Sequence, residues 1–224
     1  NAEISALEAQ IDPHFLYNTL DSINWKAIEN EQYDISSMLV ALANILRYTV
    51  DNAGGTSTLA QELGWLKQYM LLQGTRMGKI PVIETDIPEE LFGFQIHKLL
   101  LQPFVENSIL HGFEGQREGG FIRIRGEGYR EFLRITIEDN GCGMNVAQRD
   151  LIREVLRNPG SEKKCDMGIG IRNVITRMKM YYGEDFQAEL WTEEGKGTRF
   201  IFTLPLPPTE LHGQPDPAGN RISV

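Results

Sequence analysis

The sequence has no apolar run longer than six residues, the stretch from Met38 to Ala43. A membrane-spanning helix needs about 20 apolar residues, so we expect no direct membrane insertion by these 224 residues. The amino end also lacks the charged and then apolar pattern of a signal peptide. Because the chain begins with Asn1, already inside a helical pattern, we expect it to be a fragment of a longer protein.

Basic residues and cysteines are also scarce. The 22 Lys and Arg are outnumbered by 31 Asp and Glu, and the resulting formal charge of −9 argues against nonspecific binding to nucleic acid. The two cysteines, Cys142 and Cys165, fit a reducing compartment better than a disulfide-stabilised fold. The 41% hydrophobic and 24% charged content is ordinary for a globular protein that buries a core.

Two helical patterns open the chain. Residues 2–30 contain few helix breakers, and residues 35–50 place apolar side chains along one stripe at helical spacing. The short polar stretch 29–34 between them predicts an antiparallel hairpin. One hairpin has little to bury its stripe against, so we expect a homodimer whose two hairpins form a four-helix bundle. The alternative is that the hairpin packs on the rest of its own chain.

The pattern changes after the linker at Gly54 and Gly55. Thr58, with Glu62 nearby, predicts the start of a helix that ends near Met77. The later elements are a strand at 81–87, a helix at 96–110, strands at 122–125 and 133–137, a helix at 171–182, and strands at 187–193 and 197–204. We therefore expect an α+β fold, a sandwich with a largely antiparallel sheet.

Three regions follow from these patterns. We expect a helical hairpin over residues 1–53, an α/β sandwich domain over 54–208, and a proline-rich, poorly ordered tail over 209–224. The arginines between residues 117 and 134 alternate with apolar residues and have acidic neighbours, which favours a solvated sheet face over a basic patch.

Glycines form regular groups that need an explanation. They are Asp139-Asn140-Gly141-Cys142-Gly143-Met144 after a strand, Gly168-Ile169-Gly170 before a helix, and Gly195 and Gly197 before Thr198. Glycine lets a backbone approach a ligand closely, and a helix N-terminus offers N–H groups to phosphate. No GxxxxGK[ST] motif occurs, so the commonest phosphate loop is excluded. A tight turn at Asn140-Gly141 is the alternative, but an acid such as Asp139 among glycines can accept from the amine of adenine.

The apolar helix expected at 96–110 carries several polar residues near its end, in the segment Glu106-Asn107-Ser108-Ile109-Leu110-His111. Asn107 and His111 are four residues apart and share a helical face. An amide oxygen is a hard ligand suited to Mg²⁺, which keeps phosphates and waters as its other ligands. The alternatives are a capping role for Asn107 and a helix-dipole partner role for His111.

His14 lies in the segment Gln10-Ile11-Asp12-Pro13-His14-Phe15-Leu16-Tyr17-Asn18. Asp12 and Pro13 either start a helix or mark a kink in a longer one. A neutral imidazole is a competent nucleophile near pH 7, and Asn18 lies one helical turn further on, within reach of the ring. The alternative is an ordinary histidine at a helix start or kink.

Together, the segments IDPHFLYNTL, LLLQPFVENSILHG, DNGCGM and GIGIRNV resemble the cytoplasmic part of sensor histidine kinases of the Lyt/YesM type, over about residues 8–204. The resemblance implies a dimerisation and phosphotransfer hairpin followed by a Bergerat-type ATP-binding domain. It also implies autophosphorylation from ATP, transfer to a response-regulator aspartate, and a place at the cytoplasmic side of a membrane sensor. The alternatives are a non-catalytic ATP-gated relay and a Bergerat-type ATPase.

The resemblance also implies individual roles. His14 would be the phosphoacceptor beside Asn18, Glu106 the general base or the residue orienting a metal-bound water, and Asn107 the Mg²⁺ ligand. The remaining nucleotide-binding positions would be His111, Asp139, Gly141, Gly143, Gly168, Gly170 and Thr198, and residues 145–167 would form a mobile lid. Asp12 and Leu110 depart from the residues common in relatives, which changes the charge near His14 and removes one expected phosphate contact.

Overall fold

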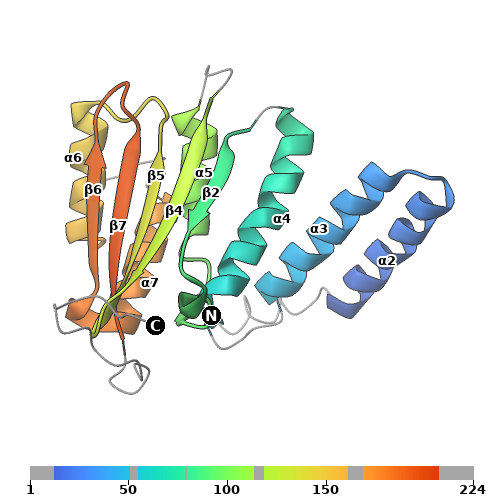
Figure 1. The fold of residues 1–224 in the computed structure, drawn as a ribbon, viewed down its shortest axis with the longest axis horizontal. Helices are drawn as coiled ribbons and strands as arrows, with labels where there is room; N and C mark the ends of the chain where they lie inside the picture. The colour runs from blue at the N-terminus through green and yellow to red at the C-terminus, as the bar shows by residue number, and fades with distance from the viewer. Residues whose placement is uncertain (1–12, 51–54, 79, 114–118, 161–168, 207–224) are drawn as a thin grey trace. The chain divides into compact units, whose positions relative to one another are not determined.

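The computed structural model describes residues 13–50, 55–78, 80–113, 119–160 and 169–206, which form two compact units (Figure 1). The helical unit contains Asn1–Gly55 and Leu63–Gly78, and the sheet unit contains Thr56–Glu62 and Lys79–Val224. This division differs from the predicted one in joining Leu63–Gly78 to the hairpin, and the boundaries at residues 53 and 208 stay predictions. The predicted tail, 209–224, lies outside the described residues.

The helical unit opens with the predicted hairpin. Helix α2, Pro13–Glu29, and helix α3, Tyr33–Val50, are joined by a short turn in which Glu31 has a φ of 56°. The N–H of Gln32 donates to the carbonyl of Ala27 over 2.8 Å, which satisfies one of the last carbonyls of α2. Across the hairpin, the hydroxyl of Ser36 donates to Asn24 Oδ1 over 2.6 Å. The antiparallel hairpin is confirmed.

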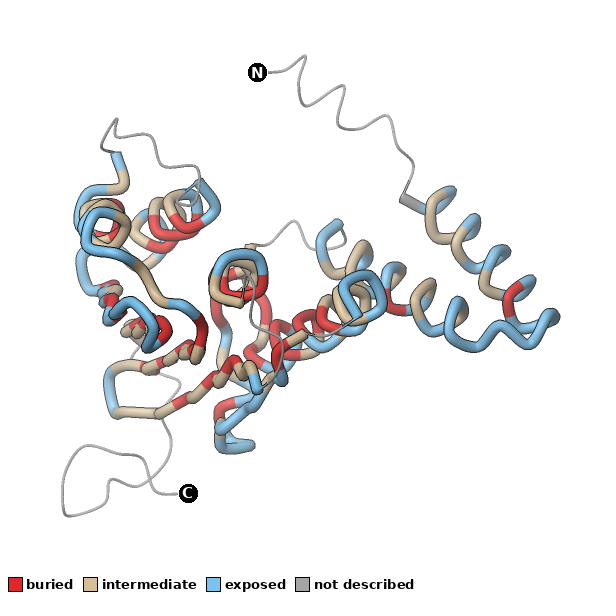
Figure 2. The backbone as a smooth tube through the Cα atoms, turned by 90° about the horizontal axis from the view of Figure 1, so that it is seen from above, coloured by how far each residue is buried: buried red, intermediate tan, exposed pale blue. Residues whose placement is uncertain are grey.

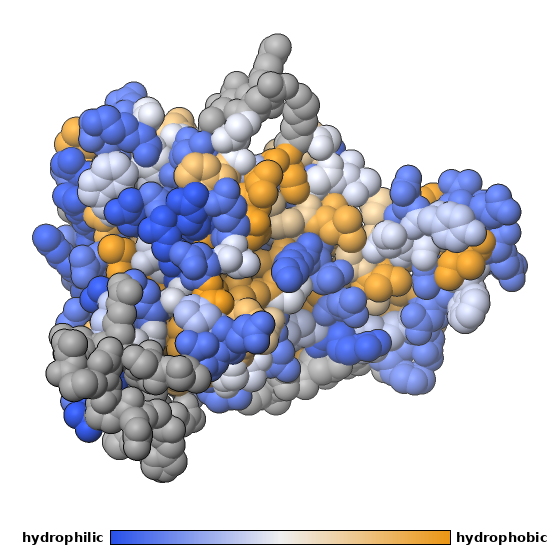
Figure 3. Space-filling view, in the orientation of Figure 1, coloured by the Kyte–Doolittle hydropathy of each residue, from blue (hydrophilic) through white to orange (hydrophobic). Residues whose placement is uncertain are grey.

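Large apolar side chains of this hairpin lie in solvent. Within residues 14–50, the buried residues are the small Ala27 and Ala41. The exposed apolar side chains are Phe15, Ile23, Trp25, Ile28, Tyr33, Ile35, Val40, Leu42 and Val50. Figure 3 shows hydrophobic residues among hydrophilic ones on this part of the surface. No helix in the described part of the chain is both long enough and apolar enough to cross a membrane.

Helix α4, Leu59–Met77, begins with a capping box. Thr58 Oγ1 accepts from the N–H of Gln61 over 3.2 Å, and Gln61 Oε1 accepts from the N–H of Thr58 over 3.0 Å. The helix start predicted at Thr58 is confirmed, but its reciprocal partner is Gln61 rather than Glu62. The carboxylate of Glu62 accepts instead from the backbone N–H groups of Leu99 and Leu101.

The sheet unit is built on five strands in the order β2-β4-β5-β7-β6 (Figure 1). Their bounds are Val82–Asp86, Phe121–Gly128, Phe132–Asp139, Thr198–Pro205 and Gln187–Thr192. Strand β2 runs parallel to β4, and every other neighbouring pair is antiparallel. A separate antiparallel pair joins β1, Thr56–Thr58, to β3, Gln95–His97. The predicted α+β class with a largely antiparallel sheet is confirmed.

One face of the sheet forms the core. Residues of β4, β5 and β7 alternate between buried and partly exposed, a pattern visible along the strands in Figure 2. Three helices cover the buried face: α5, Gln102–Asn107, α6, Val146–Arg157, and α7, Ile169–Tyr182 (Figure 1). The ring of Phe104 in α5 lies 4.8 Å from that of Phe200 and 4.6 Å from that of Phe202. Because burying one such side chain stabilises a fold by about 1.5–3 kcal/mol, these contacts attach the short α5 firmly to the sheet.

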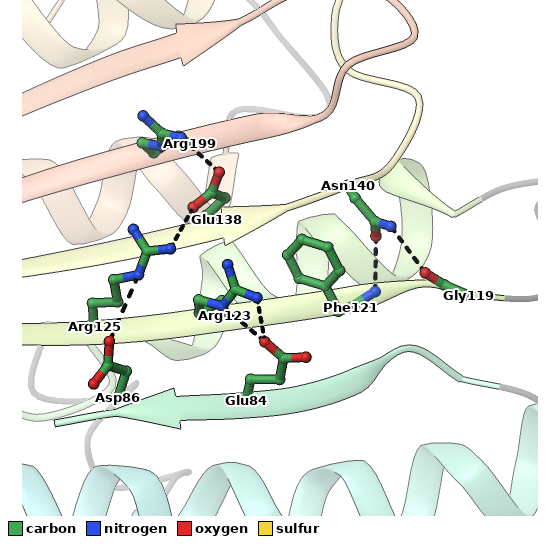
Figure 4. A network of polar contacts seen from close by, with 9 residues as sticks. All are labelled: Glu84, Asp86, Gly119, Phe121, Arg123, Arg125, Glu138, Asn140 and Arg199. Carbon is green, nitrogen blue, oxygen red and sulfur yellow. Dashed lines mark hydrogen bonds and ion pairs between the residues drawn. The ribbon is translucent and has the colours of Figure 1, made fainter.

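The other face carries paired charges (Figure 4). Arg123 Nη2 lies 2.6 Å from Glu84 Oε2, and Arg199 Nη2 lies 2.6 Å from Glu138 Oε1. Arg125 Nη2 lies 3.6 Å from the other oxygen of Glu138. Arg123 and Arg125 are therefore neutralised across neighbouring strands, which favours the predicted solvated face over a basic patch for this part of the sheet. Arg117 lies outside the described residues.

The helix predicted over residues 96–110 is wrong in its first part. Gln95–His97 is strand β3, and its pairing with β1 outweighs the helix propensity of these residues. Leu99 then adopts a φ of 55°, a backbone strain of about 1–3 kcal/mol for a residue other than glycine, and α5 begins only at Gln102. A π-helical turn, η2, follows at Ser108–Gly112.

The mobile lid predicted over residues 145–167 is wrong for its first half. Val146–Arg157 forms helix α6, whose apolar residues Ile152, Val155 and Leu156 are buried. These residues recur at helical spacing within a polar segment, a signal that its overall polarity obscured. Residues 161–167 lie outside the described residues.

Helix α6 provides a direct test of the fold. Asn145 Oδ1 accepts from the N–H of Gln148 over 3.0 Å, and Gln148 Oε1 accepts from the N–H of Asn145 over 3.1 Å. Asn145→Ala removes this cap and should lower the free energy of unfolding of the sheet unit by about 1 kcal/mol in urea titrations followed by circular dichroism. Asn173→Ala, at an exposed position of α7, is the matched control and should change it by less than about 0.5 kcal/mol. Equal effects would contradict the cap.

Candidate functional site

A pocket of about 190 Å³ opens in the sheet unit where α5 and η2 meet the ends of β5 and β7. Its lining comprises Phe104, Asn107, Ser108, His111, Gly112, Asp139, Cys142, Gly143, Met144, Gln148, Thr198 and Phe200. Five of the predicted nucleotide-binding residues are therefore brought together from three separate sequence segments: Asn107, His111, Asp139, Gly143 and Thr198.

Asp139, the last residue of β5, is the most constrained polar group of the pocket, with 6% of its surface exposed. Its Oδ1 accepts from the N–H groups of Gly141 at 2.9 Å and Thr198 at 3.2 Å. Its Oδ2 accepts from the hydroxyl of Ser108 at 2.7 Å. The carboxylate therefore joins η2, the loop after β5 and the start of β7.

Burial raises the pKa of the Asp139 carboxyl above its ordinary value, and the hydrogen bonds from Ser108, Gly141 and Thr198 oppose that rise. The nearby Glu138 charge adds to it. The fold thus keeps a carboxylate where desolvation disfavours its charge, which is a frequent property of functional sites.

The glycines of the loop after β5 approach backbone rather than open space. A Cβ on Gly141 would collide with the carbonyl of Gly112, and one on Gly143, whose φ is 65°, would collide with the carbonyl of Glu193. Gly197, with a φ of 84°, lies equally close to the carbonyl of Asp139. These glycines let three chain segments meet around the Asp139 carboxylate. They therefore determine the shape of the pocket, and Gly143 also lines it.

The second glycine group has a different environment. Gly170 lies exposed in the first turn of α7, does not line the pocket, and has only the side chain of Pro103 near its Cβ position, at 3.5 Å. Gly168 lies outside the described residues. The phosphate-binding role expected for this group stays a prediction.

Asn107 and His111 both line the pocket, although the chain changes from α-helix to π-helix between them. Asn107 Nδ2 donates to the carbonyl of Pro103 over 2.6 Å. Because the NH₂ group makes this hydrogen bond, the Asn107 Oδ1 atom is left to accept a hydrogen bond or to coordinate a metal ion. Glu106 does not line the pocket, and its Oε1 accepts from Gln102 Nε2 over 2.6 Å.

The donor set near the pocket bears on a metal ion. Among the described residues, no cluster of three or more His, Cys, Asp and Glu side chains is placed to hold one. Mg²⁺ needs no such cluster, because it is commonly held by one or two protein oxygens together with substrate phosphates and water. The Asn107 amide oxygen in the pocket wall fits that pattern.

His14 and Asn18 lie on α2 in the helical unit, and both side chains are exposed. Asn18 Nδ2 lies 3.1 Å from His14 Nδ1, so the predicted approach of the two side chains is present. An amide NH₂ can only donate, so in this arrangement Nδ1 accepts and a neutral ring carries its proton on Nε2. The residues that would decide between a helix start and a kink at Pro13 lie outside the described residues.

Several pocket residues were missed in the sequence. Ser108 binds the Asp139 carboxylate, and its place directly after Asn107 was the only local signal. Thr192 does not line the pocket but supports its wall: its buried hydroxyl accepts from the N–H of Met144 at 3.0 Å, a contact between segments 48 residues apart. Cys142 was assigned no role, yet it lines the pocket, with Sγ donating to the carbonyl of His111 at 3.2 Å.

Comparisons with known proteins agree on a family. Residues 96–208 match the model described as histidine kinase-, DNA gyrase B-, and HSP90-like ATPase, and residues 2–80 match the histidine kinase model. The sensor histidine kinase YesM of Bacillus subtilis is 36% identical over 203 residues, which cover 91% of this chain and 33% of that protein. The sensor protein kinase HptS of Staphylococcus aureus is 27% identical over 204 residues, covering 91% of this chain and 38% of that protein.

Among solved structures, the histidine kinase domain of the Erythrobacter litoralis EL346 blue-light activated histidine kinase matches with 16% identity and a TM-score of 0.49. The match covers 87% of this chain and 94% of that one. The chain spans between one third and two fifths of the length of the curated relatives it matches.

The Asp139→Asn substitution should have different effects on thermal stability and on nucleotide binding. Asparagine keeps the shape and can still accept from Gly141 and Thr198, but it removes the charge that burial disfavours. We expect an unchanged or higher melting temperature at neutral pH and a loss of nucleotide affinity of about 10- to 100-fold, measured by calorimetry. Asp150→Asn, an exposed acid on α6, is the control and should alter neither quantity appreciably.

The difference in stability between the parent and Asp139→Asn should change with pH in one direction. Because the folded Asp139 has a raised pKa, the folded state keeps its proton over a range in which the unfolded chain has lost it. Stability of the parent therefore falls as pH rises from the ordinary carboxyl pKa through the raised one. The stability advantage of the variant should be largest at neutral pH and vanish below the ordinary carboxyl pKa. An advantage that grows toward acid pH would contradict the assignment.

Cys142 reports directly on pocket occupancy. In a Cys165→Ser background, iodoacetamide should alkylate Cys142, which is exposed at the pocket wall. ATP at ten times its dissociation constant should slow this reaction about tenfold, because only the unoccupied fraction reacts. Mass spectrometry of the alkylated peptide measures the rate, and guanidine-unfolded protein with ATP is the control without protection. Equal rates with and without ATP would place the nucleotide elsewhere.

Proposed function

The chain belongs to the histidine kinase-, DNA gyrase B-, and HSP90-like ATPase family, and on that premise we propose that it is an ATP-dependent protein-histidine kinase, which transfers the γ-phosphoryl group of ATP to His14. The phosphoryl group then passes to an aspartate of a response regulator. The observation that carries this proposal is the buried Asp139 carboxylate in a pocket whose wall also holds Asn107.

Asp139 recognises adenine in this proposal. An ionised carboxylate has about four acceptor positions, and three are used by Ser108, Gly141 and Thr198. The remaining position accepts from the exocyclic amine of adenine. Because the carboxylate is held from three sides, it is already oriented before the base enters, which reduces the entropic cost of binding.

Asn107 and His111 serve the phosphate end of the nucleotide. The amide oxygen of Asn107 would hold Mg²⁺, an ion that commonly takes only one or two protein ligands beside phosphate and water. When bound, this ion neutralises negative charge on the phosphate oxygens. His111, exposed at the pocket edge, donates a hydrogen bond to phosphate or water. Gly168, Gly170 and the N-terminus of α7 complete the phosphate contacts.

His14 is the acceptor, and Asn18 orients its ring. Rotation of the Asn18 amide by half a turn exchanges its NH₂ for its oxygen, which then accepts from Nδ1–H and leaves a lone pair on Nε2. That nitrogen attacks the γ-phosphorus while the bond to the departing ADP oxygen breaks, and the ring proton on Nδ1 can then leave. Glu106, next to Asn107, remains our candidate for the base that takes it, with one carboxylate oxygen held by Gln102.

The exposed apolar side chains of α2 and α3 support the proposed homodimer, since two hairpins can bury them in a four-helix bundle. A response-regulator receiver domain is the second partner, and a cytoplasmic position in a longer membrane sensor is the proposed location. The proposed regions are the phosphotransfer hairpin at 1–53 and the ATP-binding domain at 54–208.

Labelling with γ-³²P-ATP and Mg²⁺ tests the function. The protein should gain label that is lost in acid and kept in base, because a phosphorus–nitrogen bond is acid-labile. His14→Gln should reduce labelling below about one hundredth of the parent's while nucleotide affinity stays within about twofold, because the pocket is in the other unit. His212→Gln is the matched control and should label normally.

The other outcomes identify other functions. Release of free phosphate without labelled protein would indicate an ATPase, and nucleotide binding with neither product would indicate a relay. Acid-labile label retained on His14→Gln would remove His14 from its role.

A further inference from the structure

Glu62, in the first turn of α4, is a buried acid that the phosphoryl-transfer argument does not use. Its exposed fraction is 2%. Glu62 Oε1 accepts from the N–H of Leu99 at 2.6 Å, and Oε2 accepts from the N–H of Leu101 at 3.3 Å. A buried carboxylate is tolerated only where it is paired or hydrogen-bonded. Here it is bound to the turn that precedes α5, away from its own helix.

That turn needs support from outside. Leu99 has a φ of 55°, a conformation that residues other than glycine rarely adopt. On its carbonyl side, Arg177 Nη2 of α7 donates to Lys98 at 2.9 Å and to Leu99 at 3.2 Å. Glu62 holds the N–H groups and Arg177 holds the carbonyls. Burial lowers the pKa of the Arg177 guanidinium, and the negative charge of Glu62 partly opposes that lowering, so the two charged groups interact.

The turn sets the direction of α5. Leu101 immediately precedes the helix, and its carbonyl accepts from the N–H groups of Phe104 and Val105, both at 3.2 Å. The contacts of Phe104 with Phe200 and Phe202 attach α5 to the sheet at one point, but six residues are too few to fix the direction of a helix by themselves. Asn107 is the last residue of this helix. A change of direction at Leu101 therefore displaces the Asn107 amide in the pocket wall.

We propose that Glu62 is a positioning residue: by binding the N–H groups of Leu99 and Leu101, it fixes the direction of α5 and thereby the Asn107 amide. This inference rests on the proposed function, in which Asn107 serves the metal-bound phosphates. The adenine contact does not depend on it to the same degree, because Asp139 is also held by Gly141 and Thr198. Loss of Glu62 should therefore affect Mg²⁺ use and rate more than adenine binding.

Glu62→Gln in the whole 224-residue chain tests this. The amide keeps one acceptor oxygen but turns an NH₂ group toward the second N–H, which opens the clamp. We expect the maximal rate of autophosphorylation to fall about 10- to 100-fold, with a threefold or greater rise in the Mg²⁺ concentration for half-maximal rate. Binding of ADP without Mg²⁺ should change by less than about twofold.

Gln61→Ala is the matched control, because it removes the capping partner of α4 at the neighbouring position and leaves the Leu99 turn intact. It should lower the melting temperature without moving the Mg²⁺ dependence. Arg177→Lys is the second test variant, since it weakens the same turn from the carbonyl side, and it should reproduce the Mg²⁺ shift.

The outcomes are distinct. If the parent gains no acid-labile label, the proposed function fails, and this inference fails with it. If the parent is labelled but Glu62→Gln keeps its rate and Mg²⁺ dependence, or loses ADP binding in proportion to rate, only the positioning role is overturned. Failure of both Glu62→Gln and Arg177→Lys to fold would make the pair purely structural and would also overturn it.

Discussion

The site depends on one buried carboxylate. Asp139 is 6% exposed and is kept ionisable there by one hydroxyl and two backbone N–H groups. Those donors come from η2, the loop after β5 and the start of β7, so the carboxylate also determines how these three segments meet. Removing any donor leaves a buried charge less compensated, which is costly in a low-dielectric environment. The hydrogen bonds that hold the proposed adenine-binding carboxylate are thus the same ones that join the chain segments at this end of the sheet.

The two faces of the sheet have separate roles, one for apolar packing and one for polar contacts. Its inner face packs on α5, α6 and α7, and its outer face pairs Arg123, Arg125 and Arg199 with acids on neighbouring strands. Strand alternation makes this separation possible, because successive side chains point to opposite faces. The pocket lies at the edge of the inner face, where Asp139 ends β5 and Thr198 begins β7. The binding residues lie at the strand ends and on the covering helix, where loops and helix termini leave backbone groups available for a ligand.

The proposed chemistry uses two units with different tasks. The sheet unit holds a nucleotide on preorganised groups, whereas the helical unit presents His14 at an exposed position on α2. Phosphoryl transfer depends mainly on positioning and on neutralising phosphate charge, so an acceptor on a separate unit needs only to be presented in line. An exposed imidazole also suits a group that must later give its phosphoryl group to another protein.

Local patterns in the sequence were enough to predict the hairpin, the alternating strands and the charged face, because periodicity and turn chemistry act over a few residues. The pocket residues Asn107, His111, Asp139, Gly143 and Thr198 received their roles from the resemblance of four segments to a kinase family. The local patterns missed β3, since its pairing with β1 depends on residues nearly 40 positions away. They also missed α6, because its few apolar residues at helical spacing lie within a polar segment. Ser108 and Glu62 bind groups 31 and 37 positions distant, respectively. The sequence by itself determined most of the helices and strands and five residues of the pocket wall. The tertiary structure alone decided which buried polar groups satisfy each other, because those partners meet only after the chain has packed.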